Sequence, residues 1–135
     1  MHRLPAALDI VNPKLAGSAY PFPSLAGVGQ ALKLVQGLSQ RMGLPWDERL
    51  LQLAGLCTIT DVTPLVGYNR YILAGGLRSM TADPKPGLKE LLRLSDLALP
   101  RKEGLSTDSI SFVLGPRLNA PGSQGHAISS YNLLR

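Results

Sequence analysis

The sequence is poor in several residue types, and each shortage excludes a class of protein. Its 135 residues include one cysteine, so the chain has no internal disulfide and no cysteine framework for a metal. The two histidines, His2 and His126, are not in a zinc-type spacing. One Trp, four Tyr and two Phe are few for a β-sandwich, whose strands are usually rich in aromatic and β-branched residues.

Charge and long apolar runs are also scarce. Charged residues make up 17% of the chain, below the usual quarter or so, which argues against long disordered tails. No stretch approaches the roughly 20 apolar residues of a membrane helix. Pro5, Asp9 and Lys14 interrupt any apolar core that a secretory leader would need. We therefore expect a soluble, cytoplasmic chain with no membrane partner.

The sequence is rich in leucine and has more basic than acidic residues. The 26 leucines favour helices. The net charge of +5 permits binding to nucleic acid or another polyanion. No run of Lys or Arg is longer than Arg101-Lys102, so a charge excess that serves only solubility explains the balance equally well.

The pattern of apolar residues predicts a mainly α chain with one N-terminal strand. Leu8 to Val11, closed by Asn12-Pro13, indicates a short strand, and since no partner strand follows, its sheet is expected elsewhere. Helices are predicted over residues 24–42, 47–59, 69–80, 86–94, 107–118 and 126–134, and Ser24 and Asp47 are the N-cap candidates of the first two. The first should bury one face, formed by Leu25, Val28, Ala31, Leu34, Val35, Leu38 and Met42. Gly75-Gly76 should loosen the third helix, and the Pro- and Gly-rich residues 119–125 should end the fifth.

The candidate functional residues each allow two interpretations. Asp61 follows an apolar helix and precedes Val62-Thr63-Pro64, so it is either a helix-capping turn residue or a metal ligand. Cys57 lies on the apolar face of its helix, which favours a buried structural thiol over a nucleophile. The sequence contains no G-x-S-x-G, H-E-x-x-H or P-loop motif.

Two further segments could contact phosphate. Arg117 and Asn119 stand at a predicted helix end, where a guanidinium and an amide suit a phosphate. Arg117 could equally cap carbonyl groups or pair with a surface acid. Gly27-Val28-Gly29 resembles half of a phosphate-binding fingerprint, but no third glycine follows, so close packing at a helix start is the simpler interpretation.

Three stretches, taken together, resemble the RecJ family of single-stranded-DNA-specific exonucleases. They are Leu25-Ala26-Gly27-Val28-Gly29, the run from Thr58 to Arg70 (TITDVTPLVGYNR), and the run from Phe112 to Ala120 (FVLGPRLNA). Val11-Asn12-Pro13-Lys14 and Lys85-Pro86-Gly87-Leu88 match connecting segments of that family in the same order. The resemblance covers residues 4–127.

The resemblance implies a fold, an activity and a metal. RecJ enzymes are DHH phosphoesterases, whose α/β domain uses two Mn²⁺ or Mg²⁺ ions to hydrolyse single-stranded DNA from the 5′ end in repair and recombination. The chain then resembles a mainly α fragment of such a domain, with residues 1–80 ending the catalytic domain and residues 81–135 connecting to an accessory domain that is missing here. Asp61 matches the last acidic motif, as catalytic residue and metal ligand. Arg117 and Asn119 match an Arg-Leu-Asn motif near the DNA.

The sequence also departs from the family's pattern. The earlier acidic motifs and the Asp-His-His triplet are expected before residue 4, and His2 does not replace them. Cys57 replaces the glycine that is usual in the family, and Tyr68 replaces an acidic residue. Pro121, Ser123 and His126 replace the usual Ala, Arg and acidic residue, respectively. One Asp cannot hold two metals, so the chain alone should be inactive. The rival interpretations are a non-catalytic DHH-derived DNA-binding or scaffold protein and a helical interaction module without a nucleic-acid role.

Overall fold

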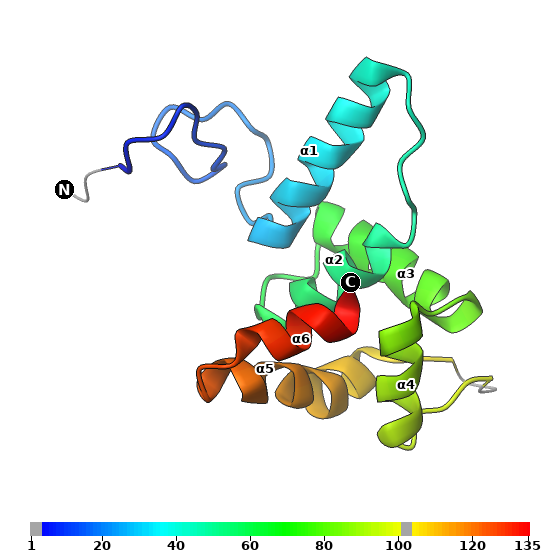
Figure 1. Ribbon diagram of the computed structural model, residues 1–135. Coiled ribbons are helices and arrows are strands. Elements are labelled where there is room, and N and C mark those ends of the chain that lie inside the picture. The colour runs from blue at the N-terminus through cyan, green and yellow to red at the C-terminus, as the bar shows by residue number, and fades with distance from the viewer. Residues whose placement is uncertain (1–3, 101–103) are drawn as a thin grey trace.

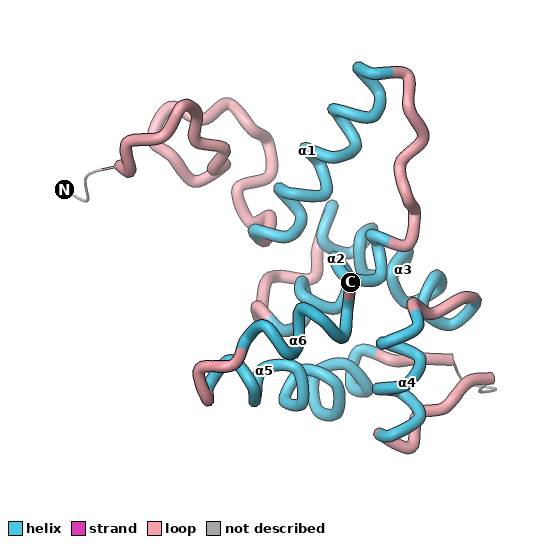
Figure 2. Tube along the Cα trace, viewed as in Figure 1, coloured by secondary structure: helices cyan, strands magenta, loops and turns pink. Residues whose placement is uncertain are grey.

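A computed structural model describes residues 4–100 and 104–135 of the chain, and every regular element in this part is helical (Figure 1, Figure 2). The elements are α1 (Gly27–Met42), α2 (Leu50–Thr60), α3 (Gly67–Ala82), α4 (Pro86–Leu94), the π-helical segment η1 (Ser109–Leu114), α5 (Gly115–Ser123) and α6 (Ala127–Leu134). None of the described helices is long and apolar enough to span a membrane. His2 and the pair Arg101-Lys102 lie outside the described residues.

The strand predicted at the N-terminus does not form in the structure. Leu8 to Val11 run as an irregular segment that projects beside α1 (Figure 2). A strand needs a neighbour to accept and donate its backbone hydrogen bonds, and the described residues supply no such neighbour. The side chains of Leu8 and Val11 are exposed accordingly. The prediction of a mainly α chain is confirmed, and the predicted N-terminal strand is wrong.

The six helical segments predicted from the sequence all contain a helix, with shifts at their starts. Gly43 ends α1 in the left-handed conformation, at φ 66°, and donates its N–H to Gln40 and Ser39. Ser24 does not cap α1, which begins three residues later without a side-chain cap. Asp47 accepts a hydrogen bond from the N–H of Arg49 at 2.9 Å, so it organises the turn that leads into α2 rather than the helix itself.

The break predicted after residue 118 is wrong, because α5 continues to Ser123 with Pro121 inside it. Pro121 has no N–H to donate to the carbonyl of Arg117, so one helical hydrogen bond is missing, and two other carbonyls of this turn are bound from outside α5. The hydroxyl of Ser130 in α6 donates to the carbonyl of Leu118 at 2.7 Å, and the N–H of His126 donates to the carbonyl of Pro121 at 2.8 Å. Ser130 of α6 and His126, which precedes α6, therefore attach the proline-containing turn of α5 to the last helix.

Two clusters of buried side chains form the core. The larger joins α2, α3, α4 and η1 through Leu56, Ile59, Leu73, Met80, Leu88, Leu91, Leu92, Leu105, Ile110 and Leu114. The smaller joins α1 to α2 and α3 through Leu25, Leu32, Leu51, Ala54 and Ile72. From α1 itself only Gly29 and Leu32 are buried, so this helix is attached along a narrow edge.

The apolar face predicted for the first helix is buried only at its start. Leu25 is buried and Val28 is partly buried, but the rest of the face is exposed. The side of α1 that faces α3 is polar: Lys33 lies over the ring of Tyr68, whose hydroxyl donates to Gln36 at 3.0 Å. The apolar stripe on the opposite side leaves Leu34 53%, Leu38 50% and Met42 67% exposed. Periodicity identifies an apolar face but not which neighbour covers it, and the described residues contain no such neighbour.

Helices α2 and α3 approach closely at two glycines. A Cβ atom at Gly76 would lie 2.5 Å from the carbonyl oxygen of Leu51 and 3.1 Å from the Cα of Gly55. Both opposing atoms are backbone atoms, which cannot move without separating the helices. The sequence suggested that Gly75-Gly76 loosens α3, but Gly76 instead permits the close contact of α3 with α2.

A buried glutamine fixes the connection from α3 to α4. Gln52 is fully buried in α2, and its amide nitrogen donates to the hydroxyl of Ser79 and to the carbonyl of Asp83 at 2.9 and 2.8 Å. Its amide oxygen accepts the N–H of Lys85 at 3.0 Å. One side chain thus satisfies the backbone groups that the end of α3 leaves unpaired.

Candidate metal and nucleic-acid site

Asp61 lies at the end of α2, in a turn that the side chain of Thr63 ties back to the helix. Its N–H donates to the carbonyl of Cys57 at 2.9 Å, which ends the helix, and its side chain is exposed. The hydroxyl of Thr63 reaches back to the carbonyl of Thr58 at 2.9 Å. Between them Val62 takes φ 53°, a conformation that β-branched residues rarely adopt. The turn is therefore well determined by its own contacts.

The Asp61 side chain opens onto a hollow of about 630 Å³ between the N-terminal segment and the start of α1. Asn12, Lys14, Gln30 and Thr63 contribute its other polar groups, and Asp61 is the only carboxylate among the lining residues. No group of three or more His, Cys, Asp or Glu that could hold a metal occurs in the described ranges. Divalent Mg²⁺ or Mn²⁺ requires several oxygen ligands.

The donor set of the described residues therefore does not fit a complete metal site. Asp61 could supply one ligand, and the amide oxygens of Asn12 and Gln30 are neutral donors at the same hollow. Two divalent ions sharing this single carboxylate would leave most of their charge without a counter-ion. No hydrolytic step can be derived from these residues by themselves.

Cys57 is half-buried one turn before Asp61. Burial first, and the negative charge of Asp61 second, raise the pKa of its thiol above the ordinary value. A thiol with a raised pKa is mostly protonated at neutral pH and is a poor nucleophile. The geometry agrees with the interpretation of Cys57 as a structural thiol.

We expect alkylation of Cys57 by iodoacetamide to have its pH midpoint above that of the same thiol in the urea-unfolded chain. Since the thiolate is the reacting form, a higher pKa in the folded chain shifts the rate profile to higher pH. Asp61→Asn removes the second cause and should move the folded midpoint back down. A folded midpoint at or below the unfolded one would contradict this account of the thiol.

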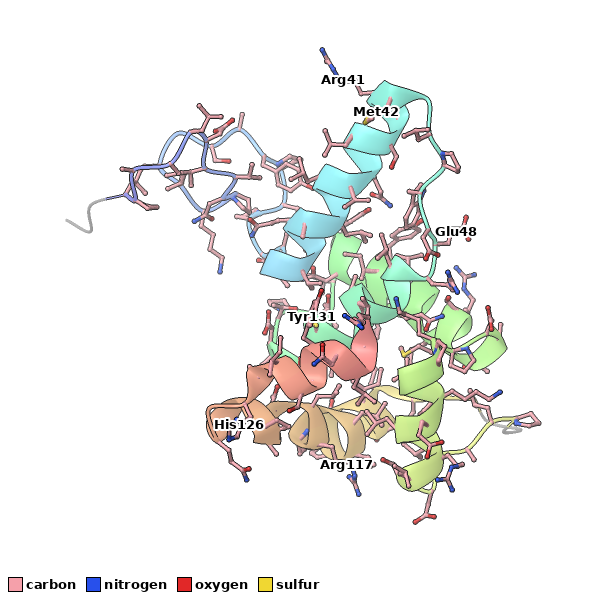
Figure 3. All side chains as sticks on the ribbon, in the orientation of Figure 1. Arg41, Met42, Glu48, Arg117, His126 and Tyr131 are labelled. Atoms are coloured by element: carbon pink, nitrogen blue, oxygen red, sulfur yellow. The ribbon has the colours of Figure 1, made fainter. Side chains whose placement is uncertain are left out.

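Arg117 and Asn119 lie exposed on α5, directly after the π-helical segment. The Nη1 of Arg117 donates to the carbonyl of Val113 at 2.8 Å, so part of the guanidinium caps its own helix. The rest of the side chain points away from the body of the molecule (Figure 3). The Asn119 side chain has no hydrogen bond in the described part of the chain. The backbone carbonyl of Asn119 accepts a hydrogen bond from the hydroxyl of Ser123 at 3.3 Å.

The two candidate segments adjoin in the structure but their side chains do not meet. A Cβ atom at Gly115, the first residue of α5, would lie 2.9 Å from the Cγ2 of Thr60, so the end of α2 touches the start of α5. Among the described residues no hydrogen bond or ion pair connects Asp61 to Arg117 or Asn119. His126 is at the far turn between α5 and α6 (Figure 3).

In the Gly27-Val28-Gly29 segment Gly29 serves packing, whereas a Cβ atom at Gly27 would have no neighbour within 4 Å. A Cβ atom at Gly29 would lie 2.5 Å from the Cδ1 of Leu25 and 3.3 Å from the Cδ1 of Ile72. This contact agrees with the simpler interpretation of the segment, close packing at the start of α1.

Sequence reasoning missed the polar groups that are fully buried. Asn69 donates from Nδ2 to the carbonyls of Ser24 and Pro64, at 2.9 and 3.0 Å, and so attaches the start of α3 to the segment before α1. Asn69 and Gln52 were hidden from pattern analysis because they occupy core positions where an apolar residue is the rule. The sequence signal that could have identified these buried groups is an amide side chain within an otherwise apolar helical face.

Comparison with known proteins identifies the segment. No protein-family model matches the sequence. The single-stranded-DNA-specific exonuclease RecJ of Bacillus subtilis is 40% identical over 133 residues, 97% of this chain. The corresponding RecJ of Escherichia coli is 36% identical over 131 residues, 88% of this chain. The chain belongs to the RecJ family. It spans only 16% and 22% of the length of these two relatives.

Solved RecJ structures share the fold of this segment. The crystal structure of Thermus thermophilus RecJ in complex with Mn²⁺ matches with a TM-score of 0.70 and 32% identity, over 82% of this chain and 16% of that one. A structure of exonuclease RecJ bound to manganese matches with a TM-score of 0.71 and 30% identity, over 90% of this chain and 29% of that one. The Thermus protein has also been solved with Mg²⁺. The expectation that the family is a divalent-metal enzyme is thereby confirmed.

Proposed function

We propose that this chain is the part of a RecJ-type exonuclease that adds one acidic metal ligand and one DNA-contacting helix to the active site. The supporting observation is the close contact between the end of α2, which carries Asp61, and the start of α5, which carries Arg117. The parent activity is Mn²⁺- or Mg²⁺-dependent hydrolysis of single-stranded DNA from the 5′ end, in repair and recombination, in the cytoplasm. Residues 1–80 end the catalytic domain, and residues 81–135 connect it to an accessory domain.

The exposed apolar side of α1 supports the proposal that further RecJ-type domains complete the site. Leu34, Leu38 and Met42 form a stripe that the described residues leave bare. Apolar stripes of this kind usually pack against another element. Since the chain spans about a fifth of its curated relatives, the remaining ligands for a metal would come from the rest of such a protein. By itself the described segment should not catalyse.

A non-catalytic DNA-binding or scaffold protein derived from the same family is the second candidate. The presence of one carboxylate at the hollow, together with a net charge of +5, favours it. The two candidates differ in the effect of metal. The longest native polypeptide that contains this sequence should degrade single-stranded DNA when Mn²⁺ is added and stop when EDTA removes it. Binding to DNA without metal-dependent degradation would leave the second candidate.

Removal of the Arg117 guanidinium should weaken binding to single-stranded DNA of every sequence to a similar degree. A phosphate contact carries no sequence information, and its loss should lower the slope of log affinity against log salt by about one unit. Arg93→Ala removes one equal charge on α4, where Arg93 is paired with Glu90, and is the matched control. An unchanged salt slope for Arg117→Ala would leave only its role in capping Val113.

A further inference from the structure

The outer surface of α3 carries a second feature that suits single-stranded nucleic acid. Tyr71 is 52% exposed, and its ring stacks on that of Tyr68, with centroids 5.3 Å apart and planes inclined by 28°. The ammonium of Lys33 lies 3.8 Å from the centroid of the same Tyr68 ring. The hydroxyl of Tyr68 is fixed by Gln36. Lys33, Tyr68 and Tyr71 thus form a contiguous stack in which Tyr71 is exposed.

Charge around this stack has one sign. Neither α1 nor α3 contains an acidic residue, and residues 10–46 and 62–82 contain none. Arg70 and Arg78 are exposed on α3 and pair with no carboxylate in the described part of the chain. Of the acids that precede α2, Asp47 is already paired with Arg49. Glu48 and Asp83 border these acid-free stretches, and neither forms an ion pair with Arg70 or Arg78 in the described part of the chain. The surface of α3 therefore has an excess of positive charge.

The spacing on α3 places the ring between the two arginines. Residues 70, 71, 74 and 78 follow the three-, four- and seven-residue intervals of one helical stripe, and all four are exposed. At a rise of about 1.5 Å per residue, Arg70 and Arg78 are separated by roughly 12 Å along the helix, about three stacked nucleotides. Ala74 between them is small enough to leave the ring accessible from along the helix.

We infer that this stripe is a second contact for single-stranded DNA, in which a base stacks on Tyr71 and flanking phosphates bind Arg70 and Arg78. Aromatic stacking tolerates any base, and cations beside the ring supply the salt-dependent attraction to the backbone. The Tyr68 stack fixes the Tyr71 ring, so little side-chain freedom is lost when a base binds. This inference rests on the proposed function for the identity of the ligand, but uses a different surface from Asp61 and Arg117. It also lies across α1 from the bare stripe of Leu34, Leu38 and Met42.

The test is the affinity of the chain for a fluorescein-labelled oligothymidine of about 15 nucleotides, within the range of single-strand site sizes, measured by anisotropy. Tyr71→Ala should weaken binding roughly 5- to 100-fold, the loss of one stacked base. Tyr71→Phe should stay within about twofold of the unaltered chain, because the ring remains. Tyr131→Ala, which removes a ring that is 61% exposed on α6, is the matched control and should change nothing. Helicity by circular dichroism must be the same in all four proteins.

The outcomes separate this inference from the proposed function. Weaker binding in Tyr71→Ala with normal binding in Arg117→Ala supports the stacking surface and contradicts the α5 contact. The reverse pattern overturns the stacking surface and leaves the proposed function in place. No binding by the unaltered chain overturns the inference. Binding that falls in Arg70→Ala but not in Tyr71→Ala also overturns it, since it indicates a phosphate contact without stacking of a base on Tyr71.

Discussion

Asp61→Ala in the longest native polypeptide should abolish Mn²⁺-dependent degradation of single-stranded DNA, with a loss of at least about 100-fold. Changes in groups that only support metal ligands commonly cost 10- to 100-fold, and removal of a ligand should cost at least as much. The Asp61 side chain is exposed at the end of α2 and makes no contact that the fold requires. The measurement is the initial rate of nucleotide release from a 5′-phosphorylated single strand.

Asp108→Ala is the matched control for this change. Asp108 is also an exposed acid at a helix terminus, and it makes no side-chain cap. Its replacement removes the same charge and should leave the rate unaltered. If Asp61→Ala retains the activity of the unaltered protein while its circular dichroism is normal, Asp61 is a turn residue and not a metal ligand.

Gly76→Ala should strongly destabilise the contact between α2 and α3. The added Cβ would meet the carbonyl oxygen of Leu51 at 2.5 Å, so α2 and α3 must move apart and the cavities that open add to the cost. We expect the free energy of unfolding to fall by about 2–4 kcal/mol, against the 0.5–1 kcal/mol that alanine normally gains over glycine within a helix. Urea denaturation followed by helical circular dichroism measures it.

Gly37→Ala provides the comparison within α1. A Cβ atom at Gly37 has no neighbour within 4 Å, so the substitution should stabilise the chain by up to about 1 kcal/mol. The opposite signs of two identical substitutions would show that close helix contact, not helix propensity, governs Gly76. Equal effects at both positions would contradict the close crossing of α2 and α3.

The helices were predictable from the sequence because their apolar residues recur at helical spacing. Pro86 and Gly43 mark a helix start and a helix end for reasons that belong to single residues: a fixed φ in one and freedom at positive φ in the other. The tertiary contacts could not be predicted from the spacing of apolar residues. The course of α5 through Pro121 depends on Ser130, a residue of another helix, and the strand at Leu8 depends on a partner that the described residues lack.

The candidate site was predicted by resemblance more than by pattern. From spacing alone, Asp61 was either a cap or a ligand, and the structure places it at the helix end where both remain chemically possible. Arg117 shows the same ambiguity, since it caps Val113 and still extends into solvent. The stack of Lys33, Tyr68 and Tyr71 was not foreseen, because its members come from two helices and only the folded chain brings them together.

The most direct test of the central claim, that the chain is one part of a RecJ-type nuclease, is the mass of the polypeptide that carries this sequence in its own cells. Antibodies against α1, or peptides from residues 27–42, would identify it in a native extract by intact-mass spectrometry. A species several-fold heavier than 14.4 kDa is predicted, because the chain spans 16% to 22% of its curated relatives. A single species of 14.4 kDa would contradict the claim, since one carboxylate cannot hold the metal that hydrolysis requires.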